Sequence, residues 1–521
     1  MKVWRSVGVL GAALGLLFAA LPSTAGAAAP ANCIADPSTP LRQFRASWVA
    51  SVVNIDWPSR TGLTAAQQQA ELVGWFDDAV RQKHNAVVLQ VRPTADAFWP
   101  STIEPWSQYL TGQQGGNPGY DPLAFAVAEA HKRNLELHAW FNPYRLSMGT
   151  NLDALVPEHP ARQHPEWVVT YGGKLYYNPG IPAVRKLVED AIMDAVSRYD
   201  IDGVHFDDYF YPYPVAGQVF DDAATYAQYG EGFPTLAEWR RNNINLLIQE
   251  LQHRIKADKP WVKFGISPFA VWRNAATDPL GSPTTAGVQT YDDLAADTRR
   301  WVREEWIDYI VPQVYWAGGF AAADYNKIVP WWAEQVRGTD VHLYIGEATY
   351  KVGTSTQSPD WSDPAELSDH LAFDSTIPEV KGNIYFSAKD VRADRLGATS
   401  LLNSKWYTRP ALVPAMPSLD SRPPLPVNGL RASRLSTGTR LQWRATSADT
   451  TSYAIYRRDL AAGDWCADND ARNLLATVRT TGGQQTFTDT TAVKGHHYLY
   501  SVTALDRTWN QSLPIPTISL G

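Results

Sequence analysis

The chain has 521 residues, of which 45% are hydrophobic and 19% charged, and its formal net charge at pH 7 is −7. This length exceeds what one hydrophobic core usually serves, so we expect one large domain and a smaller one. The acidic balance disfavours nucleic acids and anionic surfaces as partners. The 21 Trp and 24 Tyr are typical either of a large aromatic core or of a surface that stacks on sugar rings.

The N-terminus has the pattern of a secretory signal peptide. Lys2 and Arg5 form a basic start, an apolar run follows from Val7 to Leu21, and the small residues 25–27 offer a cleavage site. The apolar run is short for a bilayer span and ends at Pro22, which disfavours a membrane anchor. We therefore predict a signal peptide over residues 1–29, secretion with association with the cell wall, and no membrane insertion of the mature chain.

Only two cysteines occur in the chain, Cys33 and Cys466. An even number of cysteines in an exported protein permits a disulfide, which here would tie the mature N-terminus to the C-terminal domain. The residues before Cys33 do not fit the site of a lipid anchor, so release is expected. Whether the two cysteines pair stays open at this point.

Eight short runs of apolar, β-branched or aromatic residues predict parallel strands. The runs are 45–51, 86–91, 135–141, 203–206, 262–266, 309–314, 341–345 and 382–386. Helical patterns separate them, at 64–82, from Asp121-Pro122 onward, and at 182–198, 235–257, 291–304, 325–336 and 364–374. Eight strand–helix units predict the α/β class and a (β/α)8 TIM barrel over residues 40–408, and they favour it over an open doubly wound sheet.

The last part of the chain has a different pattern. Residues 409–427 contain six prolines and little apolar pattern, which predicts a stiff linker. Residues 428–521 alternate apolar with polar side chains around Trp443, 453–456 and 498–502, which predicts an all-β, immunoglobulin-like sandwich. These runs resemble a fibronectin type III module, a kind of domain that usually spaces or binds and does not catalyse.

The candidate catalytic residues follow the predicted strands, because the active site of a TIM barrel lies at the carboxyl ends of its strands. The run 203–206 ends in two adjacent carboxylates, Asp207 and Asp208, and Glu347 follows Gly346 after the seventh run. Hydrolysis of a glycosidic bond needs one carboxyl group as proton donor and another as nucleophile or base. The alternative for all three is a structural role in helix capping or ion pairs.

Strand parity limits what the adjacent pair can do. Neighbouring side chains on a strand point to opposite sides, so Asp207 and Asp208 do different jobs unless the strand has already ended. His205 and Asp207 share one direction, which makes Asp207 the inward candidate if that direction is the barrel interior. Asp208 would then face the rim built by the loops.

Further polar and aromatic residues near the strand ends are predicted to contact the substrate. They are Arg92, Asp96, Asn142, Tyr144, Arg145, His205, Tyr211, Gln313, Tyr315 and Trp316. For His205 a hydrogen-bonded place in the core is the common alternative. No His-x-x-x-His pair occurs, so we predict no metal and no cofactor. The same argument counts against a metal-dependent carbohydrate deacetylase, which the Asp-Asp pair superficially suggests.

Five motifs are similar to those of the glycosyl-hydrolase-like 10 family. They are Phe44-Arg-Ala-Ser-Trp-Val, Gln90-Val-Arg-Pro-x-x-Asp-Ala, Pro118-Gly-Tyr-Asp-Pro-Leu, His138-Ala-Trp-Phe-Asn-Pro-Tyr-Arg and Asp202-Gly-x-His-Phe-Asp-Asp-Tyr-Phe-Tyr-Pro. The resemblance supports the barrel, the Asp207–Asp208 pair, and the residues Arg92, Asn142, Tyr144 and Arg145 around it.

Relatives in this family include a cell-division-associated glycosidase that cuts peptidoglycan strands lacking stem peptides. The resemblance therefore implies a secreted glycosidase, with a cell-wall polysaccharide, peptidoglycan glycan, as its substrate and partner. The alternative is a non-catalytic glycan-binding wall protein on the same barrel, because a fold does not fix an activity.

Overall fold

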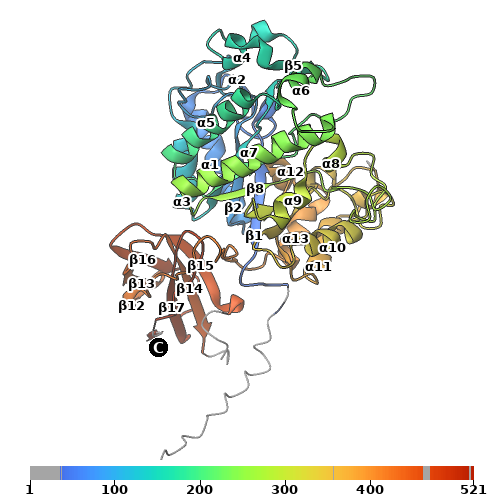
Figure 1. Cartoon of the computed structure of the whole chain (residues 1–521). Coiled ribbons are helices and arrows are strands. Elements are labelled where there is room, and N and C mark those ends of the chain that lie inside the picture. The colour runs from blue at the N-terminus through green and yellow to red at the C-terminus, as the bar shows by residue number, and fades with distance from the viewer. Residues whose placement is uncertain (1–35, 37, 356, 461–469, 516–517, 521) are drawn as a thin grey trace, which may run out of the picture.

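The structure is a computed structural model that describes residues 36, 38–355, 357–460, 470–515 and 518–520. It confirms the predicted fold class, since eight parallel strands close into a barrel surrounded by helices and a β-sandwich follows (Figure 1). The predicted signal peptide and both cysteines lie outside the described residues. Within the described part of the chain, no helix is long and apolar enough to cross a membrane.

The barrel strands follow one another in chain order, apart from a small inserted sheet. They are β1 (Phe44–Val49), β2 (Ala86–Arg92), β3 (Glu136–Phe141), β7 (Gly203–Phe206), β8 (Lys263–Ile266), β9 (Tyr309–Ile310), β10 (His342–Glu347) and β11 (Val380–Tyr385). Each of the eight predicted runs therefore contains or overlaps one strand. Strand β9 is shorter than predicted, because Pro312 has no N–H to donate to a neighbouring strand.

The helices also lie where periodicity and capping residues predicted them. They are α1 (Ala65–Arg81), α3 (Pro122–Lys132), α5 (Pro182–Arg198), α7 (Leu236–Asp258), α10 (Tyr325–Val336) and α11 (Glu366–Asp374). Two helices that were not predicted, α12 (Ala388–Ala393) and α13 (Ala398–Lys405), follow the last barrel strand. Thr64 caps α1 and forms a capping box with Gln67. The helix predicted over 291–304 is two short ones, α8 (Thr290–Asp293) and α9 (Thr298–Arg303). They are separated at Ala295, whose φ is 51°.

The inserted sheet lies between β3 and α5 and consists of β4 (Arg145–Ser147), β5 (Val168–Tyr171) and β6 (Lys174–Tyr177). It stands at the upper end of the barrel in Figure 1, close to α4 (Pro160–Gln163). Gly172 and Gly173, with φ of 58° and 74°, form the turn between β5 and β6. Two successive residues of positive φ are what a tight hairpin requires. The insertion raises one wall above the end of the barrel where the candidate site lies.

The barrel interior is aromatic and polar, where branched aliphatic side chains are usual in this fold. Phe44, His138, Tyr309 and Tyr344 fill the middle of the barrel, and the rings of Phe44 and Tyr344 stack at 4.4 Å. Glycines make room for these rings. A Cβ atom on Gly203 would lie 2.6 Å from the ring of His138, and one on Gly265 would lie 2.0 Å from the ring of Tyr309.

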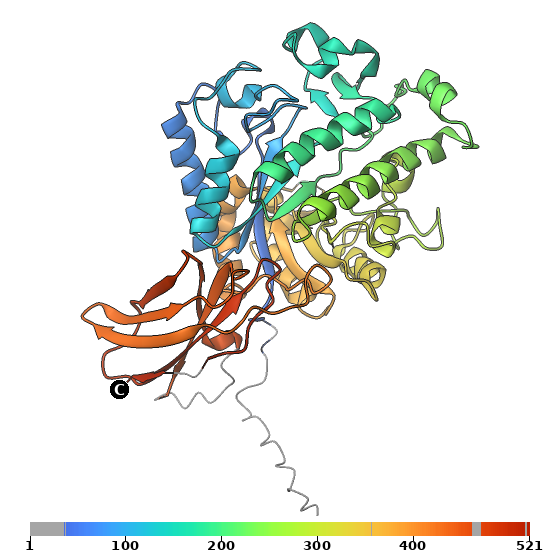
Figure 2. The ribbon, with the colours of Figure 1, turned by 60° about the vertical axis from the view of Figure 1, so that its left-hand side comes forward.

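The C-terminal sandwich has two sheets. One contains β12 (Asn428–Leu435), β13 (Gly438–Arg444) and β16 (Gln484–Asp489), and the other contains β15 (Leu474–Arg479), β14 (Ser452–Asp459), β17 (Tyr498–Leu505) and β18 (Ile518–Leu520). Its core is built around Trp443, which packs against Tyr453 with ring centroids 5.2 Å apart. Figures 1 and 2 both show the sandwich below the barrel, at the end opposite the inserted sheet.

Part of the proline-rich segment predicted as a linker packs against both domains. Leu412, Val413 and Met416 are buried in one apolar cluster with barrel residues such as Phe44 and sandwich residues such as Leu505. The N–H of Leu412 also bonds to the carbonyl of Leu41, at 2.8 Å. The segment is therefore a packed connection at the base of the barrel, which its few apolar residues did not lead us to expect.

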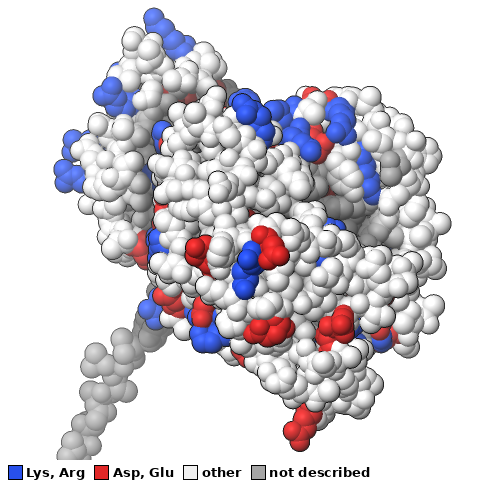
Figure 3. Space-filling view, turned by 90° about the horizontal axis from the view of Figure 1, so that it is seen from above, with Lys and Arg blue, Asp and Glu red and all other residues white. Residues whose placement is uncertain are grey.

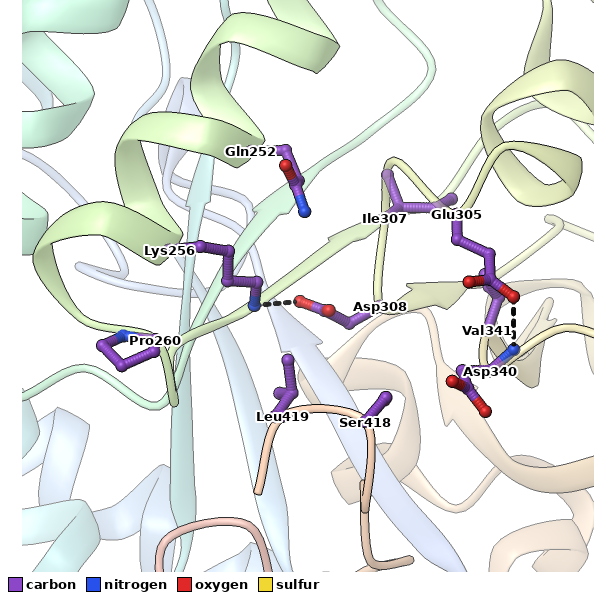
Figure 4. Close-up of a pocket in the computed structure, with 10 residues that line it drawn as sticks. All are labelled: Gln252, Lys256, Pro260, Glu305, Ile307, Asp308, Asp340, Val341, Ser418 and Leu419. Carbon is purple, nitrogen blue, oxygen red and sulfur yellow. Dashed lines mark hydrogen bonds and ion pairs between the residues drawn. The ribbon is translucent and has the colours of Figure 1, made fainter. Parts of the chain in front are cut away.

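A pocket of about 280 Å³ lies at this base, between α7, the starts of β9 and β10, and residues 418–419 (Figure 4). Lys256 Nζ and Asp308 Oδ2 form an ion pair of 2.6 Å on one side of it. The pocket is at the end of the barrel away from the candidate catalytic residues and contains none of the predicted site residues.

Candidate active site

Asp207 and Asp208 lie at the carboxyl end of β7, where the strand has already turned into a loop. The strand ends at Phe206, so the two neighbouring side chains are not forced to opposite faces. Asp207 faces Asn142 after β3, and Asp208 faces Gln313 after β9, so the pair spans the inside of the barrel mouth. The residues are 5% and 7% exposed, which leaves both carboxyl groups almost fully desolvated.

Asn142 holds Asp207 in one orientation. Its Nδ2 donates a hydrogen bond of 2.6 Å to Asp207 Oδ2. Its Oδ1 accepts bonds from Gln90 Nε2 at 2.5 Å and from Arg145 Nη2 at 3.1 Å. Gln90 is fixed in turn, because its Oε1 accepts from the N–H groups of Ser51 and Val52. This network decides which end of the Asn142 amide faces the carboxyl group.

The two carboxyl groups have different electrostatic surroundings. Burial, and next the neighbouring Asp208, raise the pKa of Asp207 to about 7. Burial also raises the pKa of Asp208, but hydrogen bonds from the Tyr213 hydroxyl and from Gln313 Nε2 oppose that rise. A large share of Asp207 is therefore still protonated near neutral pH, and Asp208 is the better stabilised anion. A protonated acid beside an ionised carboxylate is the pairing that glycoside hydrolysis uses.

His205 lies beneath this pair and is fully buried. Its Nε2 is 3.1 Å from Trp48 Nε1 and 3.0 Å from Ser267 Oγ, and its Nδ1 is 3.0 Å from the Tyr309 hydroxyl. Its contacts show that His205 points into the barrel, a direction that strand parity alone had left open. The prediction that His205 contacts the substrate is corrected, because both ring nitrogens have hydrogen-bond partners inside the core.

An aromatic rim lies on the side of the mouth formed by the ends of β9, β10 and β11. The ring of Tyr315 is 5.9 Å from that of Tyr350 and 6.4 Å from that of Phe386, and Trp48 lies 6.2 Å from Phe386. Trp316 contacts the ring of Phe269 edge-on at 5.3 Å. Such faces can stack on sugar rings.

Tyr209, Tyr213, Phe269, Tyr350 and Phe386 were not among the predicted site residues. Each lies in the loop that follows a barrel strand, and all but Tyr213 lie within three positions of the strand end. The signal that could have found them is the same rule that found Gln313 and Tyr315.

Glu347, predicted as a further catalytic carboxylate, is not brought to the pair. Tyr344 and Gly346 face the barrel interior, where a Cβ atom on Gly346 would lie 3.2 Å from Trp48. Glu347 therefore faces outward and is fully buried. Its carboxylate accepts bonds from Tyr325, His370 and Asn383, at 2.8, 2.9 and 3.0 Å. This placement supports the structural alternative. The prediction that Glu347 is catalytic is corrected, because its side chain is buried between the barrel wall and helices α10 and α11.

Four other predicted contact residues are buried away from the mouth. Tyr144 and Tyr211 are part of the main apolar core, with exposures of 0% and 3%. Asp96 is fully buried and accepts bonds from the N–H and the hydroxyl of Thr94. Arg92 forms a buried ion pair with Glu104, with N–O distances of 2.7 and 2.5 Å, and also donates to the carbonyl of Asn142. The prediction that these four residues contact the substrate is therefore corrected. They support the site from within the protein.

The mouth offers neutral polar and aromatic groups. In the view from above (Figure 3), Lys, Arg, Asp and Glu side chains are scattered in small groups over a surface that is otherwise uncharged. Among the residues that the structure describes, no group of three or more His, Cys, Asp and Glu side chains could hold a metal ion.

The sequence of the chain is similar to those of proteins described as glycosyl hydrolases. The model of the family described as "Glycosyl hydrolase-like 10" matches residues 43–363. Glycosyl hydrolase YngK of Bacillus subtilis is 50% identical over 478 residues, which cover 90% of this chain and 92% of YngK. Glycosyl hydrolase DigH of Escherichia coli K12 is 43% identical over 70% of this chain and 87% of its own.

A solved structure, the glycoside hydrolase domain of PgaB from Bordetella bronchiseptica, aligns with 70% of this chain and 99% of its own. The TM-score is 0.46 and the identity 15%. The family assignment depends on the sequence matches, which include the strands and loops that carry Asp207, Asp208 and Asn142. The chain belongs to the glycosyl hydrolase-like 10 family.

Proposed function

We propose that this protein is a secreted glycoside hydrolase that cleaves glycosidic bonds in the glycan strands of peptidoglycan. Membership of a glycosyl hydrolase-like family supports the reaction class. The signal-peptide pattern of residues 1–29 supports export. The choice of peptidoglycan comes from the resemblance to a family with a member that cuts such strands.

One observation carries the catalytic proposal. Asp207 is a buried carboxyl group with a pKa of about 7, next to a second carboxyl group that has two hydrogen-bond donors of its own. An acid with this pKa is protonated often enough at neutral pH to give its proton to the leaving oxygen of a glycoside. Asp208 stays ionised and serves as the second carboxylate, which attacks the anomeric carbon or activates water.

The test is incubation of the purified mature protein with intact and with peptide-stripped peptidoglycan, followed by mass analysis of the soluble fragments. We expect shortened glycan strands from the stripped material, and none with Asp207→Asn. That variant should still bind the glycan, because it removes a proton donor and keeps the shape of the site. Asp369→Asn is the matched control, since Asp369 is exposed on α11, away from the mouth.

Other outcomes would favour the competing functions. Binding of glycan without any fragments, for wild type and variant alike, would support a non-catalytic wall protein. Release of acetate that chelators abolish would instead indicate a deacetylase. Fragments from other polysaccharides, and none from peptidoglycan, would keep the reaction class and overturn the substrate.

A further inference from the structure

The base of the barrel contains buried charges that only the C-terminal sandwich covers completely. Glu136, at the start of β3, and Lys263, at the start of β8, are 2% and 1% exposed and form an ion pair. Trp509, in the turn after β17, donates its indole N–H to the same Glu136 oxygen at 2.6 Å. A buried carboxylate is tolerated only where donors surround it. The sandwich therefore supplies part of what allows Glu136 to be buried.

A single line of hydrogen bonds runs from Glu136 through the barrel to His205. Glu136 Oε2 is 2.9 Å from His138 Nε2, His138 Nδ1 is 2.8 Å from the Tyr309 hydroxyl, and that hydroxyl is 3.0 Å from His205 Nδ1. We call Glu136, His138, Tyr309 and His205 the axial column. Gly203 of β7 and Gly265 of β8 leave space for the rings of His138 and Tyr309. The backbone of these strands is therefore shaped to accommodate the column.

The column has only one consistent direction. Trp48 Nε1 can only donate, so His205 Nε2 must accept and His205 must carry its proton on Nδ1. That proton goes to the Tyr309 oxygen, so the Tyr309 hydroxyl donates to His138 Nδ1. His138 is then left with a proton on Nε2, which it donates to Glu136. The indole N–H of Trp48 at one end thus determines both histidine tautomers. At the other end the Glu136 carboxylate, which can only accept, receives the proton of His138 Nε2.

Ser267 and Gln313 connect the upper end of the column, His205, to Asp208. Ser267 Oγ is 3.0 Å from His205 Nε2, and the carbonyl of Ser267 accepts a bond of 2.8 Å from Gln313 Nε2. The same Gln313 nitrogen donates to Asp208 Oδ1 at 3.0 Å. The contacts from Trp509 to Asp208 are therefore continuous, which is the physical condition for one end to influence the other.

The sandwich is fixed to the base by more than Trp509. Arg507 forms a two-pronged ion pair with Asp200, with N–O distances of 2.5 and 3.2 Å. Tyr456 and Leu505 of the sandwich are buried in the same apolar cluster as Phe44 and Tyr344 of the barrel. A module that binds glycan on a flexible tether would not share a core with the catalytic domain.

We propose that the axial column is a positioning device, in which Trp509 and Tyr309 hold His205 and Ser267 in one hydrogen-bonding arrangement beneath Asp208. The C-terminal sandwich is thus the floor of the catalytic barrel and contributes to turnover without touching the substrate. This inference rests on the proposed function where its tests measure activity. Its spectroscopic test depends only on the hydrogen-bond pattern.

The first test removes one hydroxyl from the middle of the column. Tyr309→Phe keeps the ring and breaks the relay, and we expect kcat to fall about tenfold with KM unchanged. Tyr344→Phe is the matched control, because Tyr344 is equally buried beside Tyr309 and its hydroxyl faces His342, outside the column. Equal kcat values for the two variants, with both folded by circular dichroism, would overturn the proposal.

The second test examines the contribution of the sandwich. We expect Trp509→Phe to lower kcat several-fold, and Trp443→Phe, inside the sandwich core, to leave it unchanged. The double variant Tyr309→Phe with Trp509→Phe should lose no more than Tyr309→Phe alone, because both interrupt one path. Losses that simply multiply would mean that the two residues act independently and would refute the column.

The third test does not use activity. Nitrogen-15 spectra of histidine-labelled protein should show His205 protonated on Nδ1 and His138 on Nε2, and Tyr309→Phe should change both signals. The opposite tautomers in the wild-type protein would refute the column directly. A wild-type protein without turnover but with these tautomers would count against the proposed function and leave the column intact.

Discussion

Asn142 Nδ2 donates a 2.6 Å hydrogen bond to Asp207 Oδ2, from the end of β3 to the end of β7. This bond stabilises the ionised form of Asp207 and so opposes burial and Asp208, which both favour the protonated form. The charge of Arg145 also lowers the pKa of Asp207, and the value of about 7 is the balance of these effects. Removal of Asn142 and removal of the Asp208 charge should therefore shift the pH dependence of turnover in opposite directions.

Removal of Asn142 should make Asp207 a weaker acid. In Asn142→Ala the ionised carboxyl group loses its donor, so the pKa of Asp207 rises and the alkaline limb of the kcat profile moves to higher pH. We also expect turnover to fall by about tenfold or more, because the acid loses its fixed orientation. The measurement is kcat against pH from 5 to 9. An alkaline limb that stays near pH 7 would exclude Asp207 as the proton donor.

Removal of the Asp208 charge should have the opposite effect on the pKa. Asp208→Asn eliminates the repulsion that raises the pKa of Asp207, so the remaining activity should decline from a lower pH than in the wild type. Turnover should drop by roughly 10²–10⁴-fold, as for loss of an essential acid or base. Asp369→Asn provides the baseline for an exposed Asp-to-Asn change.

The positions of Asp207 and Asp208 could be predicted because a strand end is a local feature of the sequence. The direction of Glu347 was missed because β10 extends two residues beyond the predicted run, to Glu347. Alternation from Tyr344 through Gly346 then turns Glu347 outward. The hairpin of β5 and β6 was also missed, although the pair Gly172-Gly173 is a turn signal that could have indicated it.

Glu347, His370, Asp374 and Tyr325 form a buried cluster that should make stability depend on pH. The Tyr325 hydroxyl is 2.8 Å from Glu347 Oε1 and 2.9 Å from Asp374 Oδ2. Asn383 Nδ2 donates to the same two oxygens, at 3.0 and 2.8 Å. Two carboxyl groups that share these donors repel each other when both are ionised, which favours the protonated form of one of them. Burial and the charge of Glu347 raise the pKa of Asp374 to about 7, which identifies Asp374 as the protonated group.

His370 adds to this dependence. Burial lowers its pKa, but Glu347 and Glu366 outweigh burial and raise it to about 9. Since the pKa is raised in the folded protein, the stabilisation is complete below the unfolded value near 6.5 and is lost as the pH rises through about 9. Asp374 acts in the same direction, because its neutral form is favoured and ionisation near pH 7 opposes folding.

We therefore expect the free energy of unfolding to fall between pH 6 and pH 9, by up to about 3 kcal/mol from His370. Glu347→Gln should lower the stability at pH 6 and flatten this decline, and it should leave kcat within a few-fold of wild type. Urea unfolding at both pH values measures this, with Asp369→Asn, an exposed change on the helix that carries His370 and Asp374, as the control. A wild-type curve that is flat from pH 6 to 9 would contradict the assigned protonation states.

Contacts between the barrel and the sandwich could not be predicted from the sequence, because they join residues far apart in the chain. Trp509 contacts Glu136 across 373 positions, and no local pattern marks either residue. Glu136 lies near the start of an apolar run like those of the other strands, and Trp509 lies in the turn after β17. Prediction of such contacts needs the packing of whole domains.

The buried ion pair behind the site should matter for stability and for the position of Asn142. Glu104 accepts two hydrogen bonds from Arg92, which also donates to the carbonyl of Asn142. Glu104→Ala leaves a buried guanidinium without its anion, and we expect a loss of roughly 3–5 kcal/mol in unfolding free energy. Glu129→Ala, which removes a partly exposed partner of Arg133, should cost under about 1 kcal/mol. Denaturant unfolding of both variants measures the difference.

The aromatic rim should act in binding more than in chemistry. Tyr350 is 37% exposed and its ring lies 5.9 Å from that of Tyr315 and 6.1 Å from that of Phe386, on the far side of the mouth from Asn142. Tyr350→Ala removes a stacking face without touching the carboxyl groups, so KM should rise several-fold while kcat changes little. Tyr229, 41% exposed on α6 (Ala223–Tyr229), is the matched control. If Tyr350→Ala lowered kcat and left KM unchanged, the rim would belong to the catalytic machinery, and the assignment of the proton donor to β7 would need revision.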